Sequence, residues 1–251
     1  MVPYQGVLFD LYGTLIDGWT TAEAAQRATE LALSLGVPPD PFRALLEATY
    51  TERATGVLGD TAQTLRKLCG QIGEHPSDEV IERAATLRVE QFRAVLTVPR
   101  AETSSLLATI RDRGFRLGLV SDCSSETPAL WSSLAWAAPI EAPVFSWSEG
   151  RRKPDPHLYR LALARLELEP SECVYVGDGG SHELSGAEAV GMRALKVVYH
   201  PGAEEQHLQY DPDLEWRGTE LSLLSELLPL IGRVNKLRSF AGLGSGVRGR
   251  I

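Results

Sequence analysis

Three acidic or hydroxyl side chains stand directly after short apolar runs that are widely separated in the chain. Asp10 follows an apolar run at residues 7–9, and Ser121 and Asp178 follow comparable runs much further along. A carboxylate in such a position can act as a nucleophile, which divides one difficult substitution into an attack step and a hydrolysis step. An isolated Asp at the start of a loop is usually a turn residue, so this interpretation requires the three side chains to lie together.

The elements before these side chains should bring them to one place. A short apolar run that ends in a polar residue and a glycine is typical of a buried parallel strand. Helical patterns separate the runs, and alternation of this kind predicts a doubly wound, Rossmann-like parallel α/β sheet. Ligands bind outside the carboxyl ends of the strands in such sheets. The predicted strands are 7–9, 115–120, 144–146, 173–176 and 194–199, and the helices among them are 101–113, 156–166 and 183–190.

Residues 18–97 have helical periodicity and no strand-like alternation. An all-helical block inserted just after the first strand predicts a smaller helical cap domain over the carboxyl edge of the sheet. We therefore expect an α/β core at 1–17 and 98–231, the cap at 18–97 and a flexible basic tail at 232–251. The predicted helices of the cap are 20–35, 41–55, 60–72 and 77–96.

Composition restricts the class of protein. The 25 basic and 33 acidic residues give a formal net charge of −8, which argues against general nucleic-acid binding. The sequence has no apolar run of about 18 residues and no room for a signal peptide before the first strand, so we expect a cytoplasmic protein without a membrane partner. We expect a monomer or a homodimer.

Cysteines and the basic tail carry no predicted chemistry. Cys69, Cys123 and Cys173 form no CxxC pair and are expected to be small buried hydrophobes. Basic residues after Gly232 and a glycine-rich stretch at 242–249 predict a frayed terminus, with a phosphate or nucleic-acid contact as the minor alternative.

Four motifs in order resemble those of the haloacid dehalogenase superfamily. Residues 9–15, Phe-Asp-Leu-Tyr-Gly-Thr-Leu, are similar to the first motif, and Ser121 after its hydrophobic run is similar to the second. Lys153 with the Pro-Asp-Pro that follows resembles the third, and residues 177–183 resemble the fourth. The helical block occupies the position of the family's inserted cap of the C1 type. The resemblance implies a hydrolase that acts on a small molecule through Asp10.

The resemblance also implies roles for the residues around this nucleophile. Gly13 allows a close approach of the backbone, and Thr14 can donate a hydrogen bond to the group being transferred. Ser121 would bind a second substrate oxygen, and Lys153 would neutralise negative charge and orient the nucleophile. Asp122, directly after Ser121, is expected to contact the substrate.

A metal site is predicted from the acidic residues of the first and fourth motifs. Asp10, Asp178 and Glu183 would repel one another and raise each other's pKa if no cation joined them. An all-oxygen ligand set completed by water suits Mg²⁺. The resemblance adds the backbone carbonyl of Tyr12 as a ligand. Glu183 would bind the ion directly or through water, or else serve as a helix N-terminal carboxylate.

Tyr12 departs from the pattern of the superfamily's phosphatases, which carry a second aspartate there to protonate the leaving group and activate water. General acid–base catalysis of this kind accelerates a reaction roughly 10²–10⁴-fold. The phenol of a tyrosine, with a pKa of about 10, could donate a proton but is a poor base at neutral pH. A tyrosine at position 12 resembles the first motif of the 2-haloacid dehalogenase branch. Asp122 and Asp178, in contrast, differ from the residues that this branch has at their positions. Asp17, His182 or the cap would have to supply a substitute acid.

We predict Mg²⁺-dependent, phosphatase-like hydrolysis of a small phosphorylated metabolite. The alternatives are 2-haloacid dehalogenase-like hydrolysis of a carbon–halogen bond and a non-catalytic, ligand-binding homologue. Caps of this kind close over the site and select the substrate. Arg43 and Tyr50 are predicted substrate contacts, because with Arg53 they recur at spacings of seven and three that can share one helical face. Trp19 and Arg66 are further candidates, whereas Trp131, Trp136 and Trp147 are expected to pack.

Overall fold

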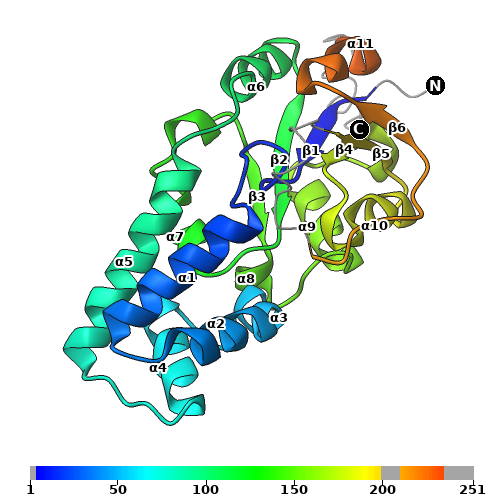
Figure 1. Cartoon of the computed structure of the whole chain (residues 1–251). Helices are drawn as coiled ribbons and strands as arrows, with labels where there is room; N and C mark the ends of the chain where they lie inside the picture. Colours follow the sequence, from blue (N-terminus) through cyan, green and yellow to red (C-terminus); the bar gives the residue numbers. More distant parts are fainter. Residues whose placement is uncertain (1–3, 199–209, 235–251) are drawn as a thin grey trace, which may run out of the picture.

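A computed structural model of the chain describes residues 4–198 and 210–234. Within them a six-stranded parallel sheet has helices on both faces, and a helical lobe extends from one end of the sheet (Figure 1). The strand order β3-β2-β1-β4-β5-β6 confirms the predicted doubly wound, Rossmann-like fold. The strands are β1 (Gly6–Phe9), β2 (Arg116–Ser121), β3 (Ala142–Phe145), β4 (Cys173–Gly177), β5 (Arg193–Val197) and β6 (Thr219–Leu221).

Helices cover the sheet and build the lobe. Those around the sheet are α6 (Thr103–Asp112), α7 (Glu126–Trp131), α8 (Ser146–Glu149), α9 (Pro156–Arg165), α10 (Glu183–Ala189) and α11 (Leu227–Ile231). Those of the helical lobe are α1 (Thr21–Leu35), α2 (Pro39–Ala48), α3 (Tyr50–Ala54), α4 (Thr61–Gln71) and α5 (Asp78–Leu96). Short 3₁₀ turns lie at Ala135–Ala137, Pro170–Glu172, Gly180–His182 and Leu224–Glu226.

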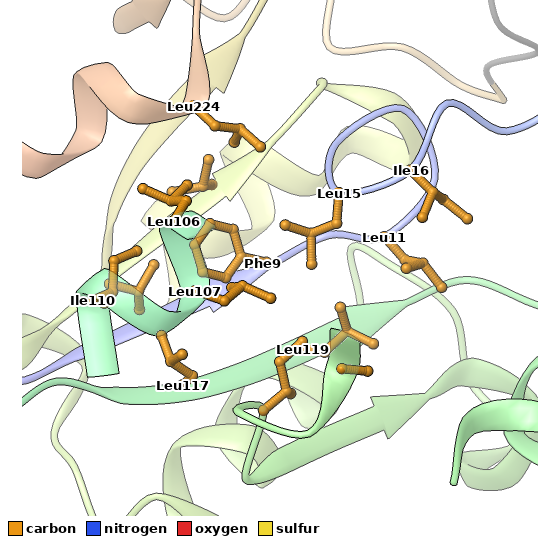
Figure 2. Packing of buried hydrophobic residues seen from close by; sticks show 14 of the residues in the cluster. Phe9, Leu11, Leu15, Ile16, Leu106, Leu107, Ile110, Leu117, Leu119 and Leu224 are labelled. Carbon is orange, nitrogen blue, oxygen red and sulfur yellow. The ribbon is translucent and has the colours of Figure 1, made fainter. Parts of the chain in front are cut away.

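Alternate residues of β1 to β5 enter the two cores on opposite faces of the sheet. Phe9 of β1 packs on one face against leucines of α6 and β2, as Figure 2 shows. Leu8 faces the opposite core, which contains Tyr159 of α9 and Leu184 of α10. Burial on both faces explains why these strands are continuous apolar runs rather than alternating ones.

The helical lobe has a hydrophobic cluster of its own, formed by buried residues of α1, α2, α4 and α5 together with Val37 and Leu58. Local signals define its helices: Thr20 and Asp60 each form a capping box, and Gly36 ends α1 with a left-handed backbone. The prediction of one helix over 41–55 was wrong. The helix breaks at Thr49, whose hydroxyl donates to the carbonyl of Leu45, a bond that often bends helices.

Other differences from the predicted elements lie at the edges of the sheet. β3 begins two residues earlier than expected and includes Pro143, which is tolerated because β3 is an edge strand. β6 was not predicted, because two of its three residues are exposed and it has no apolar run. Position 199 of the strand expected at 194–199, and the basic tail from residue 235 onward, lie outside the described residues. None of the helices in the described ranges is long and apolar enough to span a bilayer.

Candidate active site

The carboxyl ends of three adjacent strands carry the predicted residues. Asp10 follows β1, Ser121 ends β2 and Asp178 follows β4, and these strands are neighbours in the order β2-β1-β4. Lys153 enters the same edge from the loop between α8 and α9. The structure therefore brings the four side chains to one site, because parallel strands end at a common edge.

Lys153 joins two carboxylates at the centre of this site. Its Nζ lies 2.5 Å from Asp10 Oδ1 and 2.5 Å from Glu183 Oε2, and its side chain is only 4% exposed. Burial opposes the charge of the lysine, but Asp10 and Glu183 together outweigh it and hold the pKa of Lys153 well above its usual range. Lys153 is therefore a permanent cation beside the expected nucleophile.

Burial also perturbs the two carboxyl groups. It raises the pKa of Asp10 to about 6, with Lys153 opposing the shift and Asp178 adding to it. The pKa of Glu183 lies well above its usual range, first because it is fully buried and then because Asp10 is close. Burial is the largest cause of both shifts, and the repulsion between neighbouring carboxylates adds to it.

Asp10, Asp178 and Glu183 can each offer one oxygen to a metal ion, and these oxygens lie within 4.8 Å of one another. With all three carboxyls ionised, the site has two more negative charges than Lys153 balances, and a divalent cation would offset them. Glu183 fits less well as a direct ligand. Oε1 accepts from the Gly179 amide and Oε2 from Tyr175 as well as Lys153. The residues fit Mg²⁺, with Asp10 and Asp178 as the better-placed carboxylates.

The loop after β1 is shaped to lie against Asp178. Gly13 has a φ of +79°, and a Cβ there would collide with the Asp178 carboxylate. Any other residue would be strained by this conformation and would displace the Asp178 side chain. Gly13 therefore allows the first and fourth motifs to approach closely.

Ser121 ends β2 with a buried hydroxyl. Its side chain is fully buried, and its Oγ has no hydrogen-bond partner among the residues that the structure describes. Buried hydroxyls normally have a partner. A substrate oxygen would supply the missing one, in agreement with the role predicted for Ser121.

Asp122 contacts two protein donors. Its Oδ1 accepts from the Lys153 backbone amide at 2.9 Å, and its Oδ2 lies 3.4 Å from Arg152 Nε. Asp122 lines the cleft described below, but both of its oxygens already contact protein donors. Through the bond to the Lys153 amide, Asp122 positions that lysine.

The hydroxyl of Tyr12 is hydrogen-bonded to a residue of α7. It lies 2.8 Å from Thr127 Oγ1 of α7, and burial raises the pKa of the phenol well above its usual range. Of the substitute acids predicted from the sequence, Asp17 lines the cleft but pairs with Arg100 at 2.9 Å. The His182 ring is half exposed beside Asp213 and lies outside the cleft lining.

A cleft of about 530 Å³ lies between this edge of the sheet and the helical lobe. The candidates Trp19, Arg43, Tyr50 and Arg53 all line it, although the last three come from two helices rather than one face. Arg66 does not belong to this lining and pairs instead with Asp78 at 2.7 Å.

Trp131, Trp136 and Trp147 pack, as predicted. Trp131 contacts Trp136 and Phe145 edge to face, and Trp136 donates to the carbonyl of Leu96. Trp147 donates to the carbonyl of Gly59. Cys69, Cys123 and Cys173 are free and buried, also as predicted.

Comparison with known proteins identifies the family. Residues 4–191 match the haloacid dehalogenase-like hydrolases. The chain belongs to this family of hydrolases. Pyrophosphatase PpaX from Bacillus pumilus is 28% identical over 90% of this chain and 95% of its own length. Phosphoglycolate phosphatase from Salmonella typhimurium is 26% identical over 91% and 92% of the two chains.

Solved structures support the fold of this haloacid dehalogenase-like hydrolase. A 2-haloacid dehalogenase from Pseudomonas syringae pv. Tomato has a TM-score of 0.65 at 24% identity, and the match covers 91% of this chain and 97% of that one. A phosphatase of the same family from Thermococcus onnurineus has a TM-score of 0.58 at 22% identity, covering 92% and 100%. Both kinds of enzyme thus share the fold, which by itself does not select between them.

Arg152 of this hydrolase was missed by sequence reasoning. Besides Asp122, its guanidinium contacts Thr51 of α3, Ser181 and Asp211, and it lies over the ring of Tyr50. It therefore ties the edge of the sheet to the helical lobe. Its position in the basic run 151–153 indicates only a solvated surface, so no local signal could have identified it.

The segment 210–213 was also missed. Ser181 and His182 both have a left-handed backbone, a strained conformation, and their amides donate to the carbonyls of Tyr210 and Asp211. Tyr210 stacks on Tyr50 of the helical lobe with ring centres 3.6 Å apart. This segment therefore supports the fourth motif, and its Tyr210 lines the cleft.

Proposed function

We propose that the chain is a Mg²⁺-dependent phosphatase that hydrolyses a small phosphorylated metabolite through Asp10. The observation that carries this proposal is the position of Asp178. It adds a third carboxylate to a site that has one lysine, and the two remaining negative charges call for a divalent cation. The relatives named as phosphatases agree with it.

The chemistry follows from the groups of the site. Asp10 attacks the phosphorus atom, the bond to the ester oxygen breaks, and the leaving oxygen departs with the electron pair and takes a proton from solvent. Water then attacks the phosphorus of the aspartyl phosphate, loses a proton to solvent, and returns the carboxylate of Asp10. Mg²⁺, held by Asp10, Asp178 and the Tyr12 carbonyl, would offset charge on the phosphoryl oxygens.

The surrounding residues would bind and orient the phosphoryl group. Lys153 supplies a fixed positive charge beside Asp10, and the unpartnered hydroxyl of Ser121 would donate to a phosphoryl oxygen. Thr14, also fully buried at this edge, would bind a second oxygen. The helical lobe would act as the cap. The protein would work in the cytoplasm, without a nucleic-acid or membrane partner. Core and cap boundaries at 17/18 and 97/98 stay predictions.

One observation favours a second function, hydrolysis of a 2-haloacid. Tyr12 stands where a proton donor would be expected, and its hydroxyl is held by Thr127. Halide leaves without a proton, so this arrangement would not slow it. The same arrangement is tolerable for a phosphatase whose substrate has a good leaving group.

The test compares two assays on one preparation freed of metal with EDTA. Release of p-nitrophenolate from p-nitrophenyl phosphate should require added Mg²⁺, because this leaving group needs no proton donor. Asp10→Asn should abolish it, whereas Asp112→Asn, a change at an exposed carboxylate of α6, should not. Metal-independent chloride release from 2-chloropropionate would overturn the proposal in favour of the second function. Silence in both assays, from folded protein, would overturn both.

A further inference from the structure

Asp213 is a buried carboxylate that contacts the first turn of α10. Its Oδ2 accepts from the amide of Leu184 at 2.9 Å and from the amide of Ser185 at 3.1 Å. Its Oδ1 accepts from the hydroxyl of Ser185 at 2.7 Å and lies 3.4 Å from His182 Nδ1. The carboxylate thus satisfies amides at the start of a helix, which the helix itself leaves without acceptors.

The turn before α10 has a backbone conformation that its own residues do not favour. Ser181 has a φ of +54° and His182 a φ of +48°, values that residues other than glycine rarely adopt. The amides of both residues donate to backbone carbonyls of the segment 210–213, at 2.6 and 2.9 Å. Strained residues of this kind persist only where the surrounding structure holds them. The turn therefore depends on that segment, which Asp213 joins to α10.

The same turn separates the two carboxylates of the fourth motif. Asp178 comes before it, and its Oδ1 accepts from the Gly180 amide at 2.9 Å. Glu183 comes after it as the first residue of α10, and its Oε1 accepts from the Gly179 amide at 2.9 Å. The amide of Asp213 donates to the Gly179 carbonyl at 2.8 Å. A shift of the turn would therefore move these two carboxylates, which now have oxygens within 4.8 Å of each other.

We propose that Asp213 is a positioning residue for the Mg²⁺ site: by holding the start of α10, it keeps Asp178 and Glu183 in the arrangement that serves the cation. Mg²⁺ requires nearly ideal geometry of its ligands, so a small displacement of a carboxylate weakens its binding. Groups that orient metal ligands without touching the metal typically change metal affinity or activity by 10- to 100-fold. This inference rests on the proposed Mg²⁺-dependent activity and adds to it a residue outside the four motifs.

The experiment measures Mg²⁺ binding by isothermal titration calorimetry, with the full chain freed of metal by EDTA. Asp213→Ala removes all four contacts of the carboxylate and should weaken Mg²⁺ binding by roughly 10- to 100-fold. Asp213→Asn keeps an oxygen that can accept from both amides of α10, so it should restore most of the lost affinity. Hydrolysis of p-nitrophenyl phosphate by Asp213→Ala should fall at Mg²⁺ concentrations near the wild-type Kd and recover as Mg²⁺ is raised.

Glu102→Ala is the matched control, because Glu102 makes the same kind of contact at a different turn. Its carboxylate accepts from the amide of Leu224 at 2.7 Å and from the amide of Ser225 at 3.2 Å, ahead of α11. Its removal should lower the melting temperature, as Asp213→Ala also should, but leave the affinity for Mg²⁺ unchanged. A loss of affinity confined to Asp213→Ala would therefore distinguish positioning of the metal site from a general loss of stability.

Amide hydrogen exchange of the wild type tests the same coupling without any variant. If the contacts of Asp213 strengthen Mg²⁺ binding, then Mg²⁺ must strengthen those contacts by the same factor. Adding Mg²⁺ should therefore slow exchange of the Leu184 and Ser185 amides, which Asp213 holds. It should slow exchange of the Leu224 and Ser225 amides, which Glu102 holds, much less.

The outcomes separate this inference from the proposed function. If the wild type does not bind Mg²⁺, the proposed function fails first. If the wild type binds Mg²⁺ and Asp213→Ala binds it as tightly, the phosphatase stands and the positioning role is wrong. Equal losses of affinity in Asp213→Ala and Glu102→Ala would also overturn the inference. If Asp213→Ala does not fold, equal slowing of all four amides by Mg²⁺ in the wild type would overturn it.

Discussion

Replacing Lys153 by methionine removes the ammonium group that lies 2.5 Å from Asp10 Oδ1 and 2.5 Å from Glu183 Oε2. Methionine fills a similar volume, so the change is mainly electrostatic. Removing one partner of a buried ion pair costs about 3–5 kcal/mol. In a chain of this size each kcal/mol lowers the melting temperature by about 2–4 °C. We therefore expect metal-free Lys153→Met to melt about 6–20 °C below the wild type at neutral pH.

The difference in melting temperature between Lys153→Met and the wild type should be smaller at low pH than at neutral pH. The pKa of Asp10 is raised to about 6, so between its unfolded value of 3.8 and about 6 the folded state binds more protons than the unfolded state. Stability that Asp10 contributes is therefore lost as pH rises through about 6. Without Lys153 this pKa rises further and the loss is larger. Protonated carboxyls need no cation, so the deficit should shrink toward about pH 5.

The assay is thermal unfolding in EDTA at about pH 7.5 and about pH 5, repeated at the higher pH with Mg²⁺. Mg²⁺ should recover part of the deficit, because it replaces the missing positive charge. Lys67→Met is the matched control: Lys67 is exposed and its Nζ donates only to the carbonyl of Val57, at 3.2 Å. The electrostatic account of the site would be refuted if Lys153→Met and the wild type melted at the same temperature at the higher pH. It would also be refuted if the difference between their melting temperatures were the same at both pH values.

Three further substitutions test individual contacts. Tyr12→Phe should lower the free energy of unfolding by about 1 kcal/mol, seen in urea titration, through loss of the Thr127 hydrogen bond. It should leave kcat unchanged, since that hydroxyl donates no proton to the leaving group. Ser121→Ala should raise KM for phosphate esters by roughly 10-fold without lowering the melting temperature, because the hydroxyl has no partner among the described residues. Arg152→Met should lower kcat/KM by roughly 10- to 100-fold through misplacement of Lys153, while calorimetry should show Mg²⁺ binding retained.

Local sequence was enough to predict most of the sheet and the position of the site. An apolar run that ends in Asp10, Ser121 or Asp178 is a signal read from consecutive residues, and the strand order then places these ends together. Capping residues such as Thr20 are equally local. The break at Thr49 was missed because a hydroxyl that bonds to the preceding turn leaves the apolar spacing of a helix intact.

Residue types, their spacing and the resemblance of four motifs to a known family predicted the nucleophile, its lysine and the acidic residues beside it. Only the tertiary structure decided which charges are paired. Lys153 meets Asp10 across 143 positions, Tyr12 meets Thr127 across 115, and Arg152 meets Asp211 across 59. Sequence periodicity reports which face of an element is buried, whereas the partner of a polar atom depends on how distant elements pack.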